Sequence, residues 1–355
     1  MILVFSVWDP NTRSKIDSAK SLKKVDSIVI LGMFEINLNM LNTSFENVVD
    51  LSLQFDCPLH IITGLHSDYV LLTDIENPRY KNIKLYHWPT FFLSLTYQRL
   101  NSPYTNHNES LGLGVRDLYC GLDPETFDFT YISMTKARKK HRCIMMDLLA
   151  KNDLIEKGAV TWRSEPRCRE EFCQDIVYDF QYWKEEPLFL DQTTDDKLFN
   201  QEIVPKEYIT SFIQIVPETD DEVFFLTEKT AIALFFNKPF LVISIARFHE
   251  YLKKLGFKLY DELFDYAFDN VDDIYTRYQM ICDNITRIDN MSTQEKRQKL
   301  ALIKDKLIYN KQRGIELATD IQNFPEIWNK LAENDDIDVS INPKTFNDSI
   351  NDTKL

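Results

Sequence analysis

Residues 211–256, SFIQIVPETDDEVFFLTEKTAIALFFNKPFLVISIARFHEYLKKLG, decide the fold. Apolar runs and turn formers divide this stretch into a strand, a helix, a second strand and a second helix, at 211–218, 227–238, 239–244 and 246–256. Thr227 is a suitable N-cap for the first helix, and Gly256 ends the second. A strand–helix–strand–helix order predicts a mainly parallel sheet with helices on both faces.

The same alternation of strands and helices extends toward the N-terminus. DFTYISMT (128–135) reads as a strand that leads directly into a helix, and AVTW (159–162) reads as the next strand. Four more apolar runs predict strands in the first third of the chain, at 2–8, 25–34, 58–63 and 82–88. With 355 residues the chain is long enough for two α/β domains, each with a core of its own.

We therefore expect a domain at 1–125 and a second at 126–320. Residues 99–128 are rich in turn formers and are predicted to connect the two. The charged stretch after residue 271 is predicted to be helical, and a last helix is expected within 321–338. Residues 339–355 offer little to bury and predict a flexible tail.

Composition excludes several classes of protein. The net charge of −14 argues against general binding to nucleic acid, and no apolar run reaches the ~20 residues that span a bilayer. The N-terminus lacks the basic region of a signal peptide, so we expect a cytoplasmic protein, in the host cytoplasm if its source is viral. The six cysteines form no C-x-x-C pair. Free thiols are therefore expected rather than a metal site, even at Cys168 and Cys173 with His141 and Cys143 upstream.

Glycine is scarce, with eight residues in the chain. Neither G-x-G-x-x-G nor G-x-x-x-x-G-K-[ST] occurs, which disfavours kinases, P-loop NTPases and standard dinucleotide oxidoreductases. The motifs G-x-S-x-G and H-E-x-x-H are also missing from the sequence.

Two strand-to-helix junctions concentrate charge. KARKKHR (136–142) holds five lysines and arginines in seven positions, and Lys229 lies in the first turn of a predicted helix. Ligands of open α/β sheets bind at the carboxyl ends of strands, and a lysine at a helix N-terminus is unfavourable unless an anion lies nearby. The alternatives are a solvated helix start at 136–142 and a surface pair of Lys229 with Glu228 or Glu222.

These two junctions give the chain its resemblance to a family. The stretch 224–270, with its T-E-K-T motif at 227–230, resembles the donor-binding half of fucosyltransferase-like glycosyltransferases of the kind common in phage and marine microbial genomes. SMTKARKKHRCIMMDLLAKNDLIEKGAVTW (133–162) and NFPEIWNKL (323–331) are similar to other segments of that family. The resemblance covers about 128–332. This chain differs from the family's pattern at Thr135, where relatives often carry Asn.

The resemblance implies two Rossmann-like domains facing across a cleft, as in GT-B enzymes. It implies that the second domain binds a nucleotide sugar, with GDP-fucose the first guess, and that the first binds the hydroxyl acceptor. Transfer would invert the sugar without metal or other cofactor, so cationic side chains would meet the charge of the leaving diphosphate. Arg138 and then Lys229 are the catalytic candidates. Donor-binding candidates are Glu228, Thr227, Thr135, Arg142 and Glu218.

Other readings stay open at this stage. The acceptor could be a modified base in viral DNA, the basic patch 136–142 could bind nucleic acid, or the chain could bind sugars without catalysis. An inverting enzyme also needs a base for the acceptor hydroxyl, for which Glu35 and Asp117 are conceivable, and the sequence singles out neither.

Overall fold

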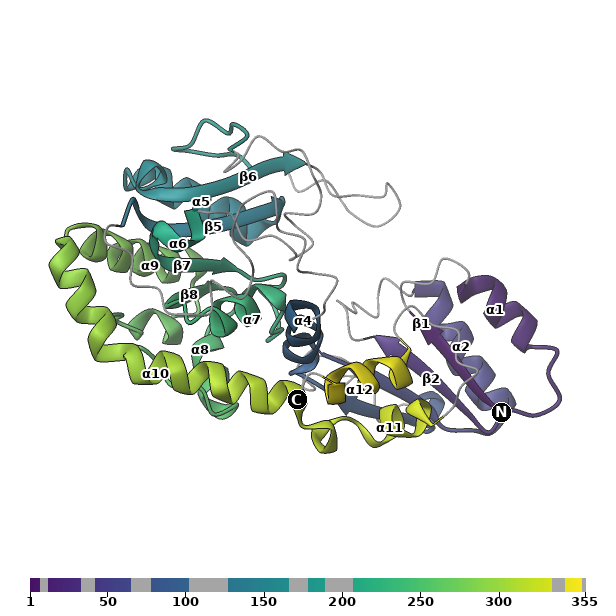
Figure 1. Cartoon of the computed structure of the whole chain (residues 1–355). Helices are drawn as coiled ribbons and strands as arrows, with labels where there is room; N and C mark the ends of the chain where they lie inside the picture. The colour runs from purple at the N-terminus through teal and green to yellow at the C-terminus, as the bar shows by residue number, and fades with distance from the viewer. Residues whose placement is uncertain are drawn as a thin grey trace. The chain divides into compact units, whose positions relative to one another are not determined.

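A computed structural model describes most of the chain. The described residues are 1–6, 12–32, 42–64, 78–101, 127–165, 178–188, 207–333 and 342–352. They form two compact units, each with a four-stranded parallel sheet, which confirms the predicted α/β class (Figure 1). No helix in this part of the chain is long and apolar enough to cross a bilayer.

Unit 1 comprises Met1–Ser94 and Leu317–Leu355. Its strands lie in the order of the sequence and are β1 (Ile2–Ser6), β2 (Ser27–Gly32), β3 (Leu59–Thr63) and β4 (Ile83–His87). Its first two helices are α1 (Thr12–Ala19) and α2 (Asn42–Gln54). The two central strands are buried along their whole length, as continuous apolar runs in a parallel sheet require.

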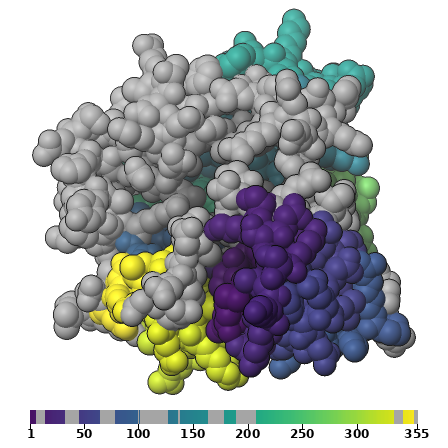
Figure 2. Space-filling view, turned by 90° about the vertical axis from the view of Figure 1, so that its right-hand side faces the viewer, coloured from purple at the N-terminus to yellow at the C-terminus, as the bar shows by residue number. Residues whose placement is uncertain are grey.

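The C-terminal segment completes unit 1. Helix α11 (Glu326–Ala332) falls within the predicted last helix, and α12 (Pro343–Asp352) occupies most of the predicted flexible tail. The tail prediction is therefore wrong for these residues. Trp88, Trp328 and Phe346 explain the difference, because their rings pack together with centroids 5.2 Å (Trp88–Trp328) and 5.4 Å (Trp328–Phe346) apart. Figure 2 shows the yellow C-terminal segment beside the purple N-terminal one.

Unit 2 comprises Leu95–Glu316. Its strand order is β6-β5-β7-β8, and the strands are β5 (Phe129–Ala137), β6 (Gly158–Glu165), β7 (Ser211–Pro217) and β8 (Phe240–Ile243). Gly158 opens β6 opposite the ring of Tyr131, and a Cβ atom there would lie 2.2 Å from Cζ of that ring. Only glycine fits this position without a shift of the ring or of the backbone.

The helices of unit 2 cover this sheet and link its strands (Figure 1). In the described part of unit 2 they are the end of α4 (Phe91–Asn101), α5 (Lys140–Lys151), α6 (Glu207–Thr210), α7 (Glu228–Phe235), α8 (Phe248–Lys254), α9 (Ile274–Asp289) and most of α10 (Thr293–Thr319). The predicted helices at 227–238 and 246–256 thus exist as α7 and α8, each shorter than its pattern.

The unit boundaries differ from the expected domain boundaries at 125 and 320. The first change of unit falls within α4 (Phe91–Asn101), whose later residue Tyr97 packs its ring on Phe235 with centroids 5.8 Å apart. The chain returns to unit 1 at Leu317, near the end of α10. Most of the predicted connecting region 99–128 lies outside the described residues.

The packing of α12 gives the first prediction. Phe346→Ala should lower the free energy of unfolding by about 3–5 kcal/mol, because it removes a fully packed ring from the Trp88–Trp328 cluster. Urea denaturation followed by tryptophan fluorescence measures this change. Asp348→Ala, at an exposed position of the same helix, is the matched control. Equal stability of the two variants would show that 343–352 is a loose tail after all.

Candidate functional site

The strand order of unit 2 marks one place on its sheet. From β5 the chain crosses to β6 on one side, and β7 then lies on the other side of β5, so the order reverses between β5 and β7. In open α/β sheets such a switch point opens a crevice at the carboxyl ends of the two strands. These ends are Ala137 and Pro217, which adjoin the two junctions that the sequence singled out.

The basic segment 138–142 turns onto the end of β7. The Arg142 guanidinium donates to the carbonyl oxygens of Pro217, at 3.2 Å, and Glu218, at 2.8 Å. His141 Nε2 lies 2.9 Å from the same Glu218 oxygen, and Lys139 Nζ donates to the carbonyl of Thr219. The two junctions, about 80 residues apart in sequence, therefore meet at Glu218–Thr219.

The carboxylate of Glu218 is buried where the two junctions meet. Its Oε1 accepts hydrogen bonds from the backbone N–H of Thr227, at 3.1 Å, and from the hydroxyl of Thr230. Its Oε2 accepts from the N–H of Thr219, at 3.2 Å, and from the hydroxyl of Thr227. Burial raises the pKa of Glu218, although Lys229 and the threonine hydroxyls pull it down in part. Both oxygens are thus occupied, which favours a positioning role for Glu218 over the predicted contact with substrate.

The first turn of α7 carries Lys229, the second catalytic candidate. Thr227 is its N-cap, as predicted, and accepts the Lys229 N–H at 3.4 Å. The Lys229 ammonium donates to Glu228 Oε1 at 2.7 Å and to Thr219 Oγ1 at 3.1 Å. Burial is the largest single influence on the pKa of Glu228 and raises it, but the Lys229 charge and the hydrogen bonds to this carboxylate together lower the pKa below its usual value. The ion pair between Lys229 and Glu228, which the sequence offered as the alternative to an anion site, is therefore present. Both side chains remain partly exposed, 25% for Lys229 and 17% for Glu228.

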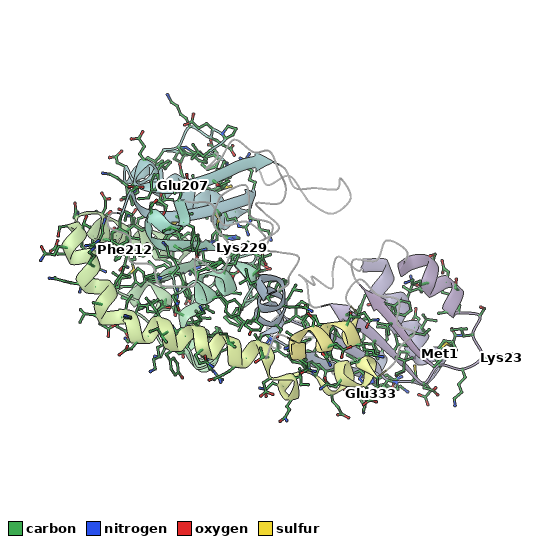
Figure 3. All side chains as sticks on the ribbon, in the orientation of Figure 1. Met1, Lys23, Glu207, Phe212, Lys229 and Glu333 are labelled. Carbon is green, nitrogen blue, oxygen red and sulfur yellow. The ribbon has the colours of Figure 1, made fainter. Side chains whose placement is uncertain are left out.

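Figure 3 shows where Lys229, in the first turn of α7, lies relative to the sheet of unit 2. Its label lies on the opposite side of unit 2 from that of Phe212, which stands at the amino end of β7. Lys229 therefore lies at the carboxyl edge, where the switch point also lies.

Arg138, the first catalytic candidate, faces the segment 178–188. Its guanidinium lies 3.1 Å from Glu185 Oε2, donates to the Tyr178 carbonyl at 3.2 Å and lies over the ring of Phe180. The side chain remains 26% exposed. Arg138 is therefore at the switch point, but an acidic partner already compensates its charge.

The remaining candidates have other surroundings. Thr135 is buried within β5, in register with Trp162 of β6, which is a packing position in the sheet. Lys140 is exposed at the start of α5. Glu35 and Asp117, the conceivable bases, lie outside the described residues.

Three polar groups at this edge were not predicted from the sequence: the Asp221 carboxylate, the Ser244 carbonyl and the Arg277 guanidinium. Asp221 Oδ1 lies 3.2 Å from His141 Nδ1, and burial lowers the pKa of His141 more than this carboxylate raises it. At the end of β8, the Ser244 carbonyl accepts a hydrogen bond from Arg277 at 3.0 Å. The polar run T-D-D at 219–221, directly after a strand, was the available signal for Asp221. Arg277 lies in an ordinary helix sequence and gave none.

Comparisons with known proteins add no further identification. None of the family models, curated proteins or solved structures compared with the chain matches it. Within the described ranges, no group of three or more His, Cys, Asp or Glu side chains could hold a metal ion.

The buried Glu218 carboxylate gives the second prediction. Glu218→Gln should lower the free energy of unfolding by about 1–3 kcal/mol, because the new amide N–H₂ would face a backbone N–H that the carboxylate now accepts. Thermal and urea unfolding measure this change. Glu222→Gln removes the same charge from an exposed side chain four residues away and should be nearly neutral. Matching losses in both variants would contradict the positioning role.

Proposed function

We propose that unit 2 binds a nucleoside-diphosphate sugar at the switch point between β5 and β7, and that the chain is a glycosyltransferase. The transfer inverts the sugar and requires no metal, and fucose from GDP-fucose is the first donor to test. The acceptor is a glycan or another hydroxyl compound. Unit 1 is proposed to receive the acceptor.

One observation carries this proposal. The two junctions that the sequence selected converge on Glu218 and Thr219, at the edge where an open α/β sheet binds its ligands. Convergence brings the cations of both junctions to this edge. A leaving nucleoside diphosphate gains negative charge in the transition state, and fixed cations at this point are what would stabilise it.

Lys229 is the residue best suited to contact the diphosphate. Its side chain is partly exposed, and the short contacts of its ammonium are to a carboxylate and to threonine hydroxyls. A phosphate oxygen can replace Glu228 Oε1 as its acceptor, which frees Glu228 for a ribose or sugar hydroxyl. Arg138 requires a similar exchange with Glu185 before it can reach the donor. Arg142 is a positioning residue, because its guanidinium binds the carbonyls at the end of β7.

The contacts of the basic segment disfavour the nucleic-acid alternative. His141 and Arg142 are buried, and Lys139 donates to a backbone carbonyl. Arg138 is paired with Glu185, which leaves Lys140 as the exposed cation of 138–142, while the side chain of Lys136, also in the patch 136–142, lies outside the described part of the structure. A polyanion needs several solvated cations along one face, and this segment presents few. A sugar-binding protein without catalysis remains the second candidate, which a turnover assay separates from the first.

The third prediction tests donor binding through Lys229. GDP should bind in the presence of EDTA, and a ligand at 100 times its Kd should stabilise the protein by roughly 2.7 kcal/mol. Lys229→Met should weaken GDP binding by at least ~10-fold, since one charge-assisted contact is worth roughly 1.5–3 kcal/mol. Isothermal titration calorimetry measures both affinities.

Lys140→Met is the control, because it removes an exposed lysine from the same edge without touching α7. If GDP does not bind at millimolar concentration, or if it binds only with manganese, the proposed donor site is wrong.

The fourth prediction concerns turnover. Arg138→Ala should lower kcat/KM for transfer, or for slow hydrolysis of the donor, by at least ~100-fold if Arg138 meets the developing charge. Glu185→Gln should retain activity, because it releases Arg138 from its acidic partner. Donor binding without hydrolysis or transfer in the wild type would favour the sugar-binding alternative. Full activity of Arg138→Ala would remove this arginine from the mechanism.

A further inference from the structure

Unit 2 has an open groove beside the switch point. It has a volume of about 700 Å³ and lies between the second half of α5, the residues 178–182 and the first turns of α9. Tyr178 connects it to the candidate site, since this residue lines the groove and its carbonyl accepts a hydrogen bond from Arg138. None of the seven candidate residues from the sequence lines this groove.

Tyrosines form the most distinctive part of the lining. Tyr182 is 58% exposed and Tyr275 is 49% exposed, and both rings border the groove together with Tyr178. Exposed tyrosines gathered around one groove offer apolar ring faces and polar hydroxyls to a ligand. Lys151 Nζ lies 5.4 Å from the centroid of the Tyr182 ring, within the same lining.

The groove is built by fixed hydrogen bonds. The Asp147 carboxylate accepts from three successive backbone N–H groups, those of Gln181, Tyr182 and Trp183, at 3.1, 2.8 and 2.9 Å. These bonds hold the backbone that carries the Tyr182 ring. On the other side, Gln279 and Asn152 exchange two amide hydrogen bonds, at 3.0 and 3.2 Å, which join α9 to the end of α5. A preorganised wall of this kind lowers the cost of ordering on ligand binding.

The charges of the lining restrict the chemistry of a ligand. Its ionisable acids and bases other than tyrosine are Asp147, Lys151 and Asp179. Two carboxylates against one ammonium disfavour a phosphate or another anion, and Lys151 disfavours a cation beside the Tyr182 ring. The lining also includes Gln181, Gln279 and Thr276, so a purely apolar ligand would leave their polar groups without partners in water or ligand. A neutral ligand with apolar faces and many hydroxyls fits both conditions.

We propose that this groove binds a neutral oligosaccharide, whose sugar rings stack on Tyr182 and Tyr275 while their hydroxyls bond to Lys151, Thr276 and Gln181. The C–H faces of a pyranose ring match an aromatic face, and its hydroxyls match amide and ammonium donors. The groove is separate from the proposed diphosphate site, so glycan binding does not depend on the proposed transferase activity. It would hold a carbohydrate chain close to Arg138.

The fifth prediction is a binding test with the full chain. Fluorescently labelled wild-type protein should bind a subset of a printed array of neutral glycans. The double variant Tyr182→Ala, Tyr275→Ala should lose at least ~10-fold in affinity for the same glycans, because it removes both of the rings on which the sugar faces would stack. Tyr309→Ala, an exposed tyrosine on α10 outside the groove, is the matched control.

The GDP affinity of the double variant separates the two proposals. This affinity should equal that of the wild type. Glycan binding can therefore fail while GDP binding persists, and GDP binding can fail while glycan binding persists. The proposal is overturned if no neutral glycan binds, or if glycan binding is unchanged in the double variant. It is also overturned if the double variant loses GDP or guanosine instead, because the groove would then hold a nucleobase.

Discussion

The buried carboxylate of Glu218 is the interaction on which the candidate edge of unit 2 depends. Its oxygens collect donors from Thr219, Thr227 and Thr230, which fixes where α7 begins. Its backbone carbonyl accepts from Arg142 and faces His141, which fixes the start of α5 against the end of β7. One residue thereby links both strand-to-helix junctions. A buried charge of this kind is tolerated only when its hydrogen bonds are complete, so the geometry of the edge is tightly constrained.

The cations of this edge are compensated in the free protein. Lys229 has Glu228, Arg138 has Glu185, and Arg142 has backbone carbonyls. An anionic ligand must therefore exchange partners rather than fill open positions, and its net affinity is the difference between new and old contacts. This arrangement keeps the ligand-free edge stable despite several like charges. Under the proposed donor site, Glu228 would become available to a ligand hydroxyl once Lys229 turns to phosphate.

Much of the fold could be predicted from the sequence, because parallel strands buried on both faces read as short apolar runs. All eight strands of the described structure coincide with such runs, and the Thr227 cap was visible from its place before an apolar helix. The helix α12 could not be predicted, since its burial depends on Trp88 and Phe91, which lie some 250 residues away. The pairing of Arg138 with Glu185 and the saturation of Glu218 are likewise tertiary effects that local patterns do not encode.

Peptide-resolved hydrogen exchange with and without GDP tests the central claim most directly, because it reports where on the chain a nucleoside diphosphate binds. Saturating GDP should slow amide exchange in two separate segments, around 138–142 and around 219–230, because a ligand held between the junctions restrains both. Protection in both segments would support a single donor site at the switch point. Protection confined to other parts of the chain, with these two segments unchanged, would contradict it.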